Sequence, residues 1–414
     1  AGFDDGIDNR KVSAMLVSGN KHLSAGTLFG LFYYDDDSNR WKKLDLPVED
    51  ERIQWLVEKE GSVMILTRSE LLQAKDDPSN FSPRQLDLPP PEGYDNKAGL
   101  FRTIWVIHSG ELYGLAGKLV VDALGVVTII LAITGALHFA MPYTLRKLKK
   151  QQKSLKLASS TKRTSATWHK KAGIWIALFL LINTITGMFL RPPFLITIAN
   201  ARVGKIPWSM LDSPNPWEDK LRALIYDEEI NGYILGTSEG LYYADGALAR
   251  EMTPLPGQPP LSVMGINVFQ KTGPGKYLVG SFNGLYDWDL RAGVPLDHLT
   301  GRYAVDRNTG SKPFGEHMVS GYVKLDNREE ICFDYNRGAF SNPETEMPSM
   351  PREILEASPM SWWNVALEVH TGRIFKPLVG DLYILIVPLM GIFGTILVVT
   401  GVIVWIKLYV RKNR

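Results

Sequence analysis

The sequence has few of the residues that build covalent or thiolate-held sites. Cys332 is the only cysteine among the 414 residues. An intrachain disulfide, a cysteine-ligated zinc or iron–sulfur centre and a thioether-attached haem are therefore excluded. A Gly-x-Gly-x-x-Gly motif, a Walker loop and a His-Glu-x-x-His motif are also absent. The sequence thus shows no nucleotide, dinucleotide or metallopeptidase site, and we assign no catalytic residue.

Charged residues are scarce in three apolar blocks, Leu119–Ala140, Ala172–Leu190 and Leu382–Ile406. About 20 residues of helix cross a hydrocarbon core of roughly 30 Å, so each block is long enough to span a membrane. A purely soluble protein is excluded. The chain starts Ala1-Gly2-Phe3 with neither Met nor a signal-peptide core. We therefore expect either a cleaved signal peptide or a fourth membrane helix upstream.

Acidic residues are missing from the stretch between the first two blocks. Tyr143–Lys171 contains ten Lys or Arg and no Asp or Glu, and Lys407–Arg414 adds four more basic residues. Short basic segments beside membrane spans stay in the cytoplasm. This places 143–171 and the C-terminus inside and residues 1–107 and 191–377 outside. We interpret the basic segment as a topology signal in contact with anionic lipid, and not as a nucleic-acid site.

The outer segments contain a repeat of the form Gly-x3-Gly-Leu-aromatic-x2-Asp. It occurs at Gly26–Asp35, Gly236–Asp245 and Gly280–Asp289, with a degenerate copy at Leu66–Leu72. A period of about 40–45 residues with Gly turns is typical of propeller blades, and the repeat resembles those of bacterial two-component regulators. We predict that residues 1–105 and 200–350 each supply about two blades, with a further blade in 302–345. Two separate β-domains are the alternative.

Two of the predicted spans also look like copies of each other. His108-Ser109-Gly110 is followed by Gly117 nine residues after the histidine, and His370-Thr371-Gly372 is followed by Gly380 ten residues after its histidine. Ile-Thr-Gly or Val-Thr-Gly ends all three spans, at Gly135, Gly187 and Gly401. Small residues let membrane helices approach closely or leave room for a flat cofactor. Packing alone accounts for most of these glycines.

Four of the seven histidines lie at the ends of the predicted spans. His108 and His370 occupy equivalent outer positions, and His138 and His169 lie at inner ends. Neutral imidazoles on facing helices are the usual axial ligands of b-type haem. Two such pairs would form an electron path across the bilayer. The alternative is that these amphipathic side chains simply sit at the membrane interface.

Spacing raises a difficulty for two haems. His108 and His138 are 30 residues apart, which is about 45 Å along a continuous helix. Either Gly110, Gly114 and Gly117 bend the chain inward, or one pair alone binds haem, or a cofactor on a further helix bridges the gap. Arg191 and Arg373 lie at the outer side, where a guanidinium would grip a haem propionate or act as an interface anchor.

Three segments resemble the PepSY-associated transmembrane helix family. They are Trp105 to His138, the stretch from Trp168-His169-Lys-Lys-Ala-Gly173 through Gly187 to Arg191-Pro192-Pro193, and His370-Thr-Gly-Arg373 through Gly401 to Trp405. Members include bacterial inner-membrane reductases of ferric siderophores that carry haem between membrane helices. The resemblance implies that the four span-end histidines are axial ligands of one or two haem b groups. It also implies that electrons move outward to Fe(III) in the periplasm.

The expected organisation alternates outer β-rich segments with membrane helices. It comprises β-rich segment 1–105, span 106–142, basic loop 143–171, span 172–191, β-rich segment 192–367, span 368–408 and tail 409–414. The fold class is thus a helical membrane part with an extracytoplasmic all-β, propeller-like domain built from two segments. This domain would place the acceptor over the outer haem.

The sequence leaves two functions open. The first is haem b electron transfer to a periplasmic iron complex, with electrons from quinol or a redox partner protein. The second is a non-catalytic, membrane-anchored propeller that senses ligands or serves as a subunit of an envelope complex, because a fold alone does not establish chemistry.

Overall fold

The structure is a computed structural model that describes residues 5–7, 11–199, 201–262, 265–304, 315–326, 329–342 and 345–409. The chain divides into two compact units. The β unit contains residues 1–95 and 213–351, and the membrane unit contains residues 96–212 and 352–414. Both segments predicted to be β-rich therefore contribute to a single unit.

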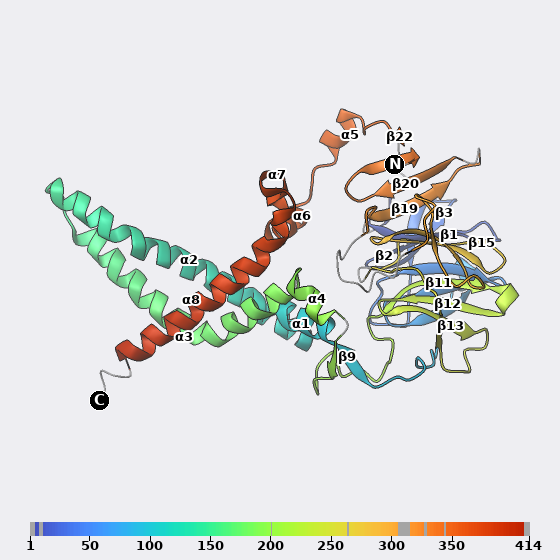
Figure 1. Cartoon of the computed structure of the whole chain (residues 1–414), viewed down its shortest axis with the longest axis horizontal. Coiled ribbons are helices and arrows are strands. Elements are labelled where there is room, and N and C mark those ends of the chain that lie inside the picture. Colours follow the sequence, from blue (N-terminus) through green and yellow to red (C-terminus); the bar gives the residue numbers. More distant parts are fainter. Residues whose placement is uncertain are drawn as a thin grey trace. The chain divides into compact units, whose positions relative to one another are not determined.

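The described part of the β unit forms five four-stranded antiparallel sheets, each a meander in sequence order (Figure 1). The first segment supplies two sheets and the second supplies three. The first two are β1–β4 (Val12–Val17, Leu23–Thr27, Gly30–Asp35, Arg40–Leu44) and β5–β8 (Trp55–Lys59, Ser62–Leu66, Leu71–Lys75, Arg84–Leu86). The others are β11–β14 (Leu221–Asp227, Gly232–Thr237, Gly240–Asp245, Thr253–Pro254), β15–β18 (Val268–Gly273, Lys276–Ser281, Gly284–Asp289, Leu296–Asp297) and β19–β22 (Val319–Lys324, Glu330–Asp334, Gly338–Asn342, Thr345–Glu346).

Each sheet packs against the next one along the chain. Buried side chains of β1–β4 join those of β5–β8 in one core, and further cores connect the later sheets in order. The first strands of successive sheets, from β1 to β19, also contact one another. This radial arrangement confirms the predicted propeller-like sheets, because blades bury their faces against neighbouring blades. A closed ring remains a prediction.

The Gly-x3-Gly repeat forms the hairpin between the second and third strands of a sheet. Its first glycine makes space for the next part of the chain, since a Cβ on Gly26 would lie 2.4 Å from Ile53 Cγ2. Its second glycine has a positive φ, 143° at Gly30 and 134° at Gly240, which side chains strongly disfavour. The hydroxyl of Thr27 accepts from the Phe29 amide inside this turn. The repeat is therefore structural.

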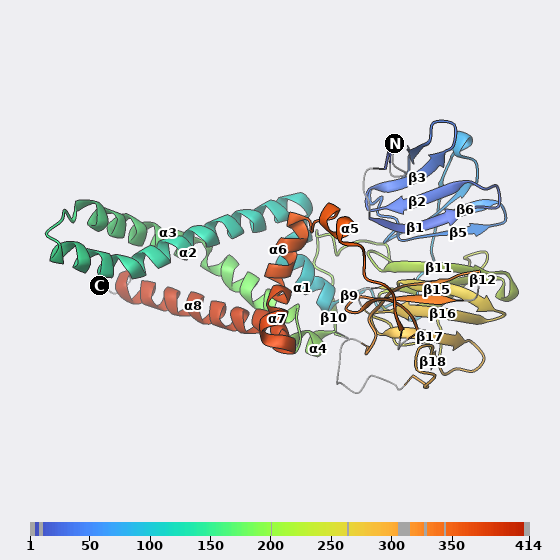
Figure 2. The ribbon, with the colours of Figure 1, turned by 90° about the horizontal axis from the view of Figure 1, so that it is seen from above.

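Within its described residues, the membrane unit contains three helices long and apolar enough to cross a membrane, as predicted. α2 (Gly114–Lys150) and α3 (Lys156–Phe189) form a helical hairpin, and α8 (Ile386–Tyr409) packs against α3 (Figure 2). Shorter elements complete the unit: α1 (Leu100–Ser109), α4 (Phe194–Ile198), α5 (Arg352–Ala357), α6 (Trp362–His370), α7 (Lys376–Val379) and the strand pair β9 (Lys97–Gly99) and β10 (Arg202–Gly204).

The basic segment 143–171 is mostly helical and not a loop. α2 continues to Lys150 and α3 already begins at Lys156. At 37 residues, α2 is about 55 Å long, well above the roughly 30 Å that a hydrocarbon core requires. The hairpin therefore extends both helices beyond the apolar blocks into a basic, solvent-facing end.

Glycines interrupt the helix between His108 and His138, which would otherwise place these two histidines about 45 Å apart. Gly110 (φ 78°) and Gly114 (φ 60°) separate α1 from α2, and Gly372 (φ 75°) and Gly380 (φ 58°) separate α6 from α8. The bend predicted as one alternative at Gly110 and Gly114 is thus present. A Cβ on Gly110 would lie 2.4 Å from Gly117 O, so the chain folds back closely at this point.

The positions of these glycines also change how the two helical copies align with each other. Gly114 and Gly380 share one conformation, with ψ of −139° and −143°. Gly380 therefore corresponds to Gly114 and not to Gly117. From this pair onward the spacing is identical, because Gly125 and Gly391 follow after 11 residues and Gly135 and Gly401 after 21. The second copy differs by a four-residue insertion, which forms α7.

Candidate functional site

The outer histidines end two short helices that have the same local design. His108 lies in the last turn of α1 and His370 is the last residue of α6. Each is followed two residues later by a glycine in the left-handed region, which turns the chain toward the next helix. The two imidazole rings lie 6.1 Å apart between centroids with an interplanar angle of 37°. The structure therefore brings the predicted outer pair together.

His108 is held by the outer end of α3. Its Nδ1 lies 3.1 Å from the carbonyl oxygen of Asn183 and 3.2 Å from Thr186 Oγ1. A Cβ on Gly187 would lie only 2.8 Å from His108 Cε1, so this position has room for the ring because it is glycine. A carbonyl only accepts hydrogen bonds, which assigns the proton to Nδ1 and leaves Nε2 with a free lone pair.

His169 is held in the same way at the inner end of the hairpin. Its Nδ1 lies 3.1 Å from Leu131 O and 3.0 Å from Thr134 Oγ1 on α2. A Cβ on Gly135 would lie 3.3 Å from His169 Cε1. Ser165 donates to Thr134 O at 2.7 Å and fixes α3 against α2 beside the ring. His169 Nε2 therefore also keeps a free lone pair.

The predicted inner pair is not brought together. His138 lies one helical turn beyond Thr134 on α2, and its side chain is exposed. In the described part of the chain, no ring contact or hydrogen bond joins it to His169. The role of His138 as a ligand remains a prediction, and the inner site has one well-placed imidazole.

The two outer arginines differ in their surroundings. Arg373 pairs with Glu368 of α6, with 2.7 Å between Nη2 and Oε1. Arg191 lies two residues after the end of α3 and is half-buried before α4. On the same outer side, Glu111 lies 3.3 Å from Lys118 Nζ and 3.7 Å from Arg102 Nη1. Propionate binding by either arginine remains a prediction.

The outer pair fits the predicted haem ligands in spacing and in chemistry. A metal–nitrogen bond of about 2 Å on each side, with about 1.2 Å from nitrogen to ring centre, separates two axial imidazoles by about 6.4 Å. The observed 6.1 Å agrees with this value. Among the described residues, no group of three or more His, Cys, Asp or Glu side chains could hold a metal ion directly.

The sequence profile of the PepSY-associated TM region matches residues 143–408, which is more than half of the chain. The protein belongs to this family. The predicted family is therefore confirmed, and its matched region includes two of the four span-end histidines, His169 and His370. No curated protein matches the chain of this PepSY-associated TM protein.

Solved structures give weak similarities. An extracellular domain of a putative hybrid two-component system from B. thetaiotaomicron aligns at 12% identity and a TM-score of 0.34, covering 79% of this chain and 26% of that one. The β-propeller domain of Cps50 (Swd1) from Myceliophteria thermophila aligns at 9% identity and a TM-score of 0.32, covering 82% and 73%. The chain thus spans about a quarter of the first of these structures.

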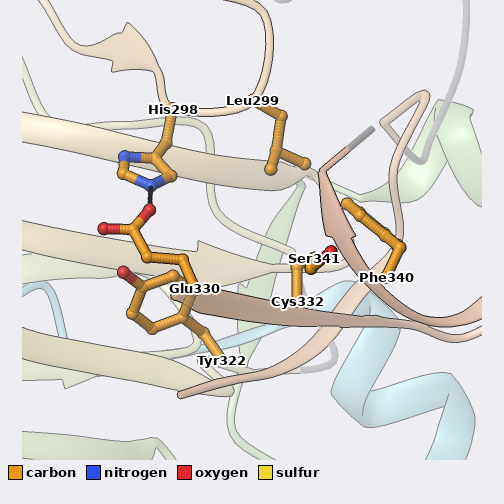
Figure 3. Close-up of a pocket in the computed structure, with 7 residues that line it drawn as sticks. All are labelled: His298, Leu299, Tyr322, Glu330, Cys332, Phe340 and Ser341. Atoms are coloured by element: carbon orange, nitrogen blue, oxygen red, sulfur yellow. Dashed lines mark hydrogen bonds and ion pairs between the residues drawn. The ribbon is translucent and has the colours of Figure 1, made fainter. Parts of the chain in front are cut away.

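Sequence reasoning did not find a cluster around His298 in the β unit. His298 Nδ1 lies 2.7 Å from Asp287. Its Nε2 lies 3.0 Å from Glu330 (Figure 3), and these contacts link two neighbouring sheets. The hydrogen bonds that His298 donates to Asp287 and to Glu330 raise its pKa, although burial opposes them. This group borders a cavity of about 170 Å³ that also includes Cys332. Burial raises the pKa of the Cys332 thiol to about 11, so it stays protonated.

The residues that hold the imidazoles were also missed. The Ile-Thr-Gly endings were visible in the sequence but were interpreted as packing sites. Thr186 and Thr134 instead contact His108 and His169. The available signal was the Thr-Gly pair that ends each span. In two of the spans, this pair lies at the same membrane depth as a histidine of another helix.

Proposed function

We propose that the protein is a haem b membrane electron-transfer protein that reduces an iron complex, such as a ferric siderophore, outside the cytoplasmic membrane. The observation that carries this proposal is the 6.1 Å spacing of the His108 and His370 rings. Membership of the PepSY-associated TM region family supports it. The protein would lie in a bacterial inner membrane, with the β unit in the periplasm and the basic hairpin end and C-terminus in the cytoplasm.

The chain's own residues would bind and orient the cofactor. His108 and His370 would supply the outer axial nitrogens, and His169 would supply a nitrogen at the inner side with His138 as its predicted partner. Haem supplies one-electron transfer at its iron when bound. The chain has no dinucleotide motif, so the reductant would be a quinol or a redox partner protein. The β unit would hold the acceptor.

The test starts from the full chain expressed with haem supply and purified in detergent. Pyridine haemochrome quantification gives haems per chain. His108→Ala and His370→Ala should each remove the same haem, because one missing axial nitrogen leaves the pair incomplete. His22→Ala, in the β unit, is the matched control and should leave the spectrum unchanged. A wild-type protein without any haem spectrum would falsify the electron-transfer proposal.

A second candidate is a membrane-anchored sensor or accessory subunit. The observation that favours it is the cavity of about 170 Å³ in the β unit, which combines Tyr322, Glu330 and Ser341 with apolar side chains. A cavity of this size admits a ligand of a few non-hydrogen atoms. A colourless wild-type protein that binds a small ligand or a stable membrane partner would favour this function over electron transfer.

A further inference from the structure

Two histidines from different helices are held by the same three groups. For His108 these groups are Asn183 O, Thr186 Oγ1 and the open face of Gly187. For His169 they are the corresponding groups of α2, namely the carbonyl three residues before the threonine, the threonine hydroxyl and the following glycine. The paired distances differ by 0.2 Å or less, at 3.1 and 3.1 Å for the carbonyl and 3.2 and 3.0 Å for the hydroxyl.

We infer that the Thr-Gly pair is a histidine cradle, in which Thr186 and Thr134 are positioning residues that fix the tautomer and rotation of His108 and His169. Each cradle holds Nδ1–H, which leaves Nε2 as the ligand atom. The assignment of iron to Nε2 rests on the proposed function. The cradle itself rests on the hydrogen bonds of the chain alone.

The threonine suits this role because its own proton is already used. Thr186 Oγ1 donates to Ile182 O at 2.7 Å, and Thr134 Oγ1 donates to Ile130 O at 2.7 Å. The hydroxyl oxygen then has lone pairs left to accept from an imidazole N–H. Valine has the same shape without this acceptor. The glycine completes the cradle because any Cβ would enter the space of the ring.

The third copy of the motif has the same threonine conformation, although among the described residues no histidine contacts it. Thr400 on α8 donates to Ile396 O at 2.7 Å and lies 3.1 Å from Leu397 O, as in the other two copies. Gly401 has no heavy atom within 4 Å among the described residues outside its own helix. The threonine conformation is therefore set by its own helix, and the histidine uses an existing acceptor.

The first measurement needs no haem. In haem-free full-length protein labelled with ¹⁵N-histidine, the nitrogen chemical shifts should assign His108 and His169 to the Nδ1–H tautomer. Each valine variant keeps the carbonyl acceptor, so Thr186→Val should reduce but not abolish the Nδ1–H population of His108 alone, and Thr134→Val that of His169 alone. Thr186→Ser and Thr134→Ser keep the acceptor and should restore the wild-type signals. Thr400→Val is the matched control and should change neither histidine.

The second measurement uses the haem-loaded protein. Removing a group that orients a metal-bound histidine costs about 10–100-fold in affinity. Thr186→Val should therefore weaken haem binding at the outer site by this factor, with wild-type affinity in Thr186→Ser and Thr400→Val. Unchanged tautomers in both valine variants would overturn the cradle. Intact tautomer control without haem binding in the wild type would instead refute the proposed function and leave the cradle standing.

Discussion

Gly187→Ala is the smallest change that tests how the outer site is built. The new Cβ would lie 2.8 Å from His108 Cε1 and 3.3 Å from His108 Nδ1. Non-bonded carbon atoms prefer a separation of about 3.5 Å or more, so the ring must retreat by roughly 0.7 Å. We expect the outer haem site to lose most of its affinity, while the helices keep their fold.

The size of the effect follows from the hydrogen bond that holds the ring. A retreat of about 0.7 Å stretches the 3.1 Å contact between His108 Nδ1 and Asn183 O to about 3.8 Å, beyond hydrogen-bonding range. The crowding itself costs about 1–3 kcal/mol. The helix propensity of alanine over glycine returns up to about 1 kcal/mol. With that return complete, folding stability should fall by about 0–2 kcal/mol, and haem affinity should fall by about 10–100-fold.

The assay is haem titration of the purified full chain with pyridine haemochrome quantification, alongside thermal unfolding. Gly135→Ala creates a contact of 3.3 Å with His169 Cε1, which a shift of about 0.2 Å relieves, so its effect should be small. Gly401→Ala, in the same motif but with open space around it, should be neutral. Equal haem affinity for Gly187→Ala and Gly401→Ala would refute the reasoning.

Three further predictions concern the β unit, each measured by unfolding of the full chain in detergent. Tyr277→Phe removes a buried hydrogen-bond donor to Asp227 and should destabilise the unit by about 1–3 kcal/mol; an unchanged unfolding midpoint would contradict this. His298→Gln should destabilise the protein at pH 6, where the charge of the imidazole is present. Because the folded pKa is raised, this stabilisation is complete below the unfolded pKa of about 6.5 and is lost as pH rises through the folded pKa. If the loss of stability in His298→Gln were the same at alkaline pH, the charge of the imidazole would not be its cause. Gly26→Ala places a Cβ 2.4 Å from Ile53 Cγ2 and should cost about 1–3 kcal/mol. An unfolding midpoint equal to that of the wild type would contradict this.

Much of the fold could be predicted because its signals are local. Apolar length identified the three spans, and the Gly-x3-Gly repeat identified hairpins whose glycines have direct steric roles at Gly26 and Gly30. The helical extent of the basic segment was missed because charge reports membrane side and not secondary structure. The register of the helical repeat was also missed, since a four-residue insertion at α7 hides the match of Gly114 with Gly380.

The candidate site was only partly predictable. Its histidines stand out because they are rare and lie at span ends. Their partners are a backbone carbonyl and a threonine hydroxyl, and no sequence pattern marks which carbonyl faces an imidazole. Likewise, the Asp287–His298–Glu330 cluster joins residues of different sheets, so it exists only once the sheets are packed.

The single copy of α3 explains why the two histidine sites lie far apart. α2 and α8 are repeats, but α3 packs against both and serves each differently. At its inner end it presents His169 to the cradle on α2, and at its outer end its own Thr186-Gly187 cradle receives His108. His169 and Thr186 are 17 residues apart, or about 26 Å along the helix, most of the thickness of a hydrocarbon core. One porphyrin cannot contact both imidazoles. The outer site has two imidazoles at ligand spacing, and the inner site has one. An outer haem would therefore need only His108 and His370 as ligands. An inner haem would require His138 to turn toward His169, or a ligand from elsewhere.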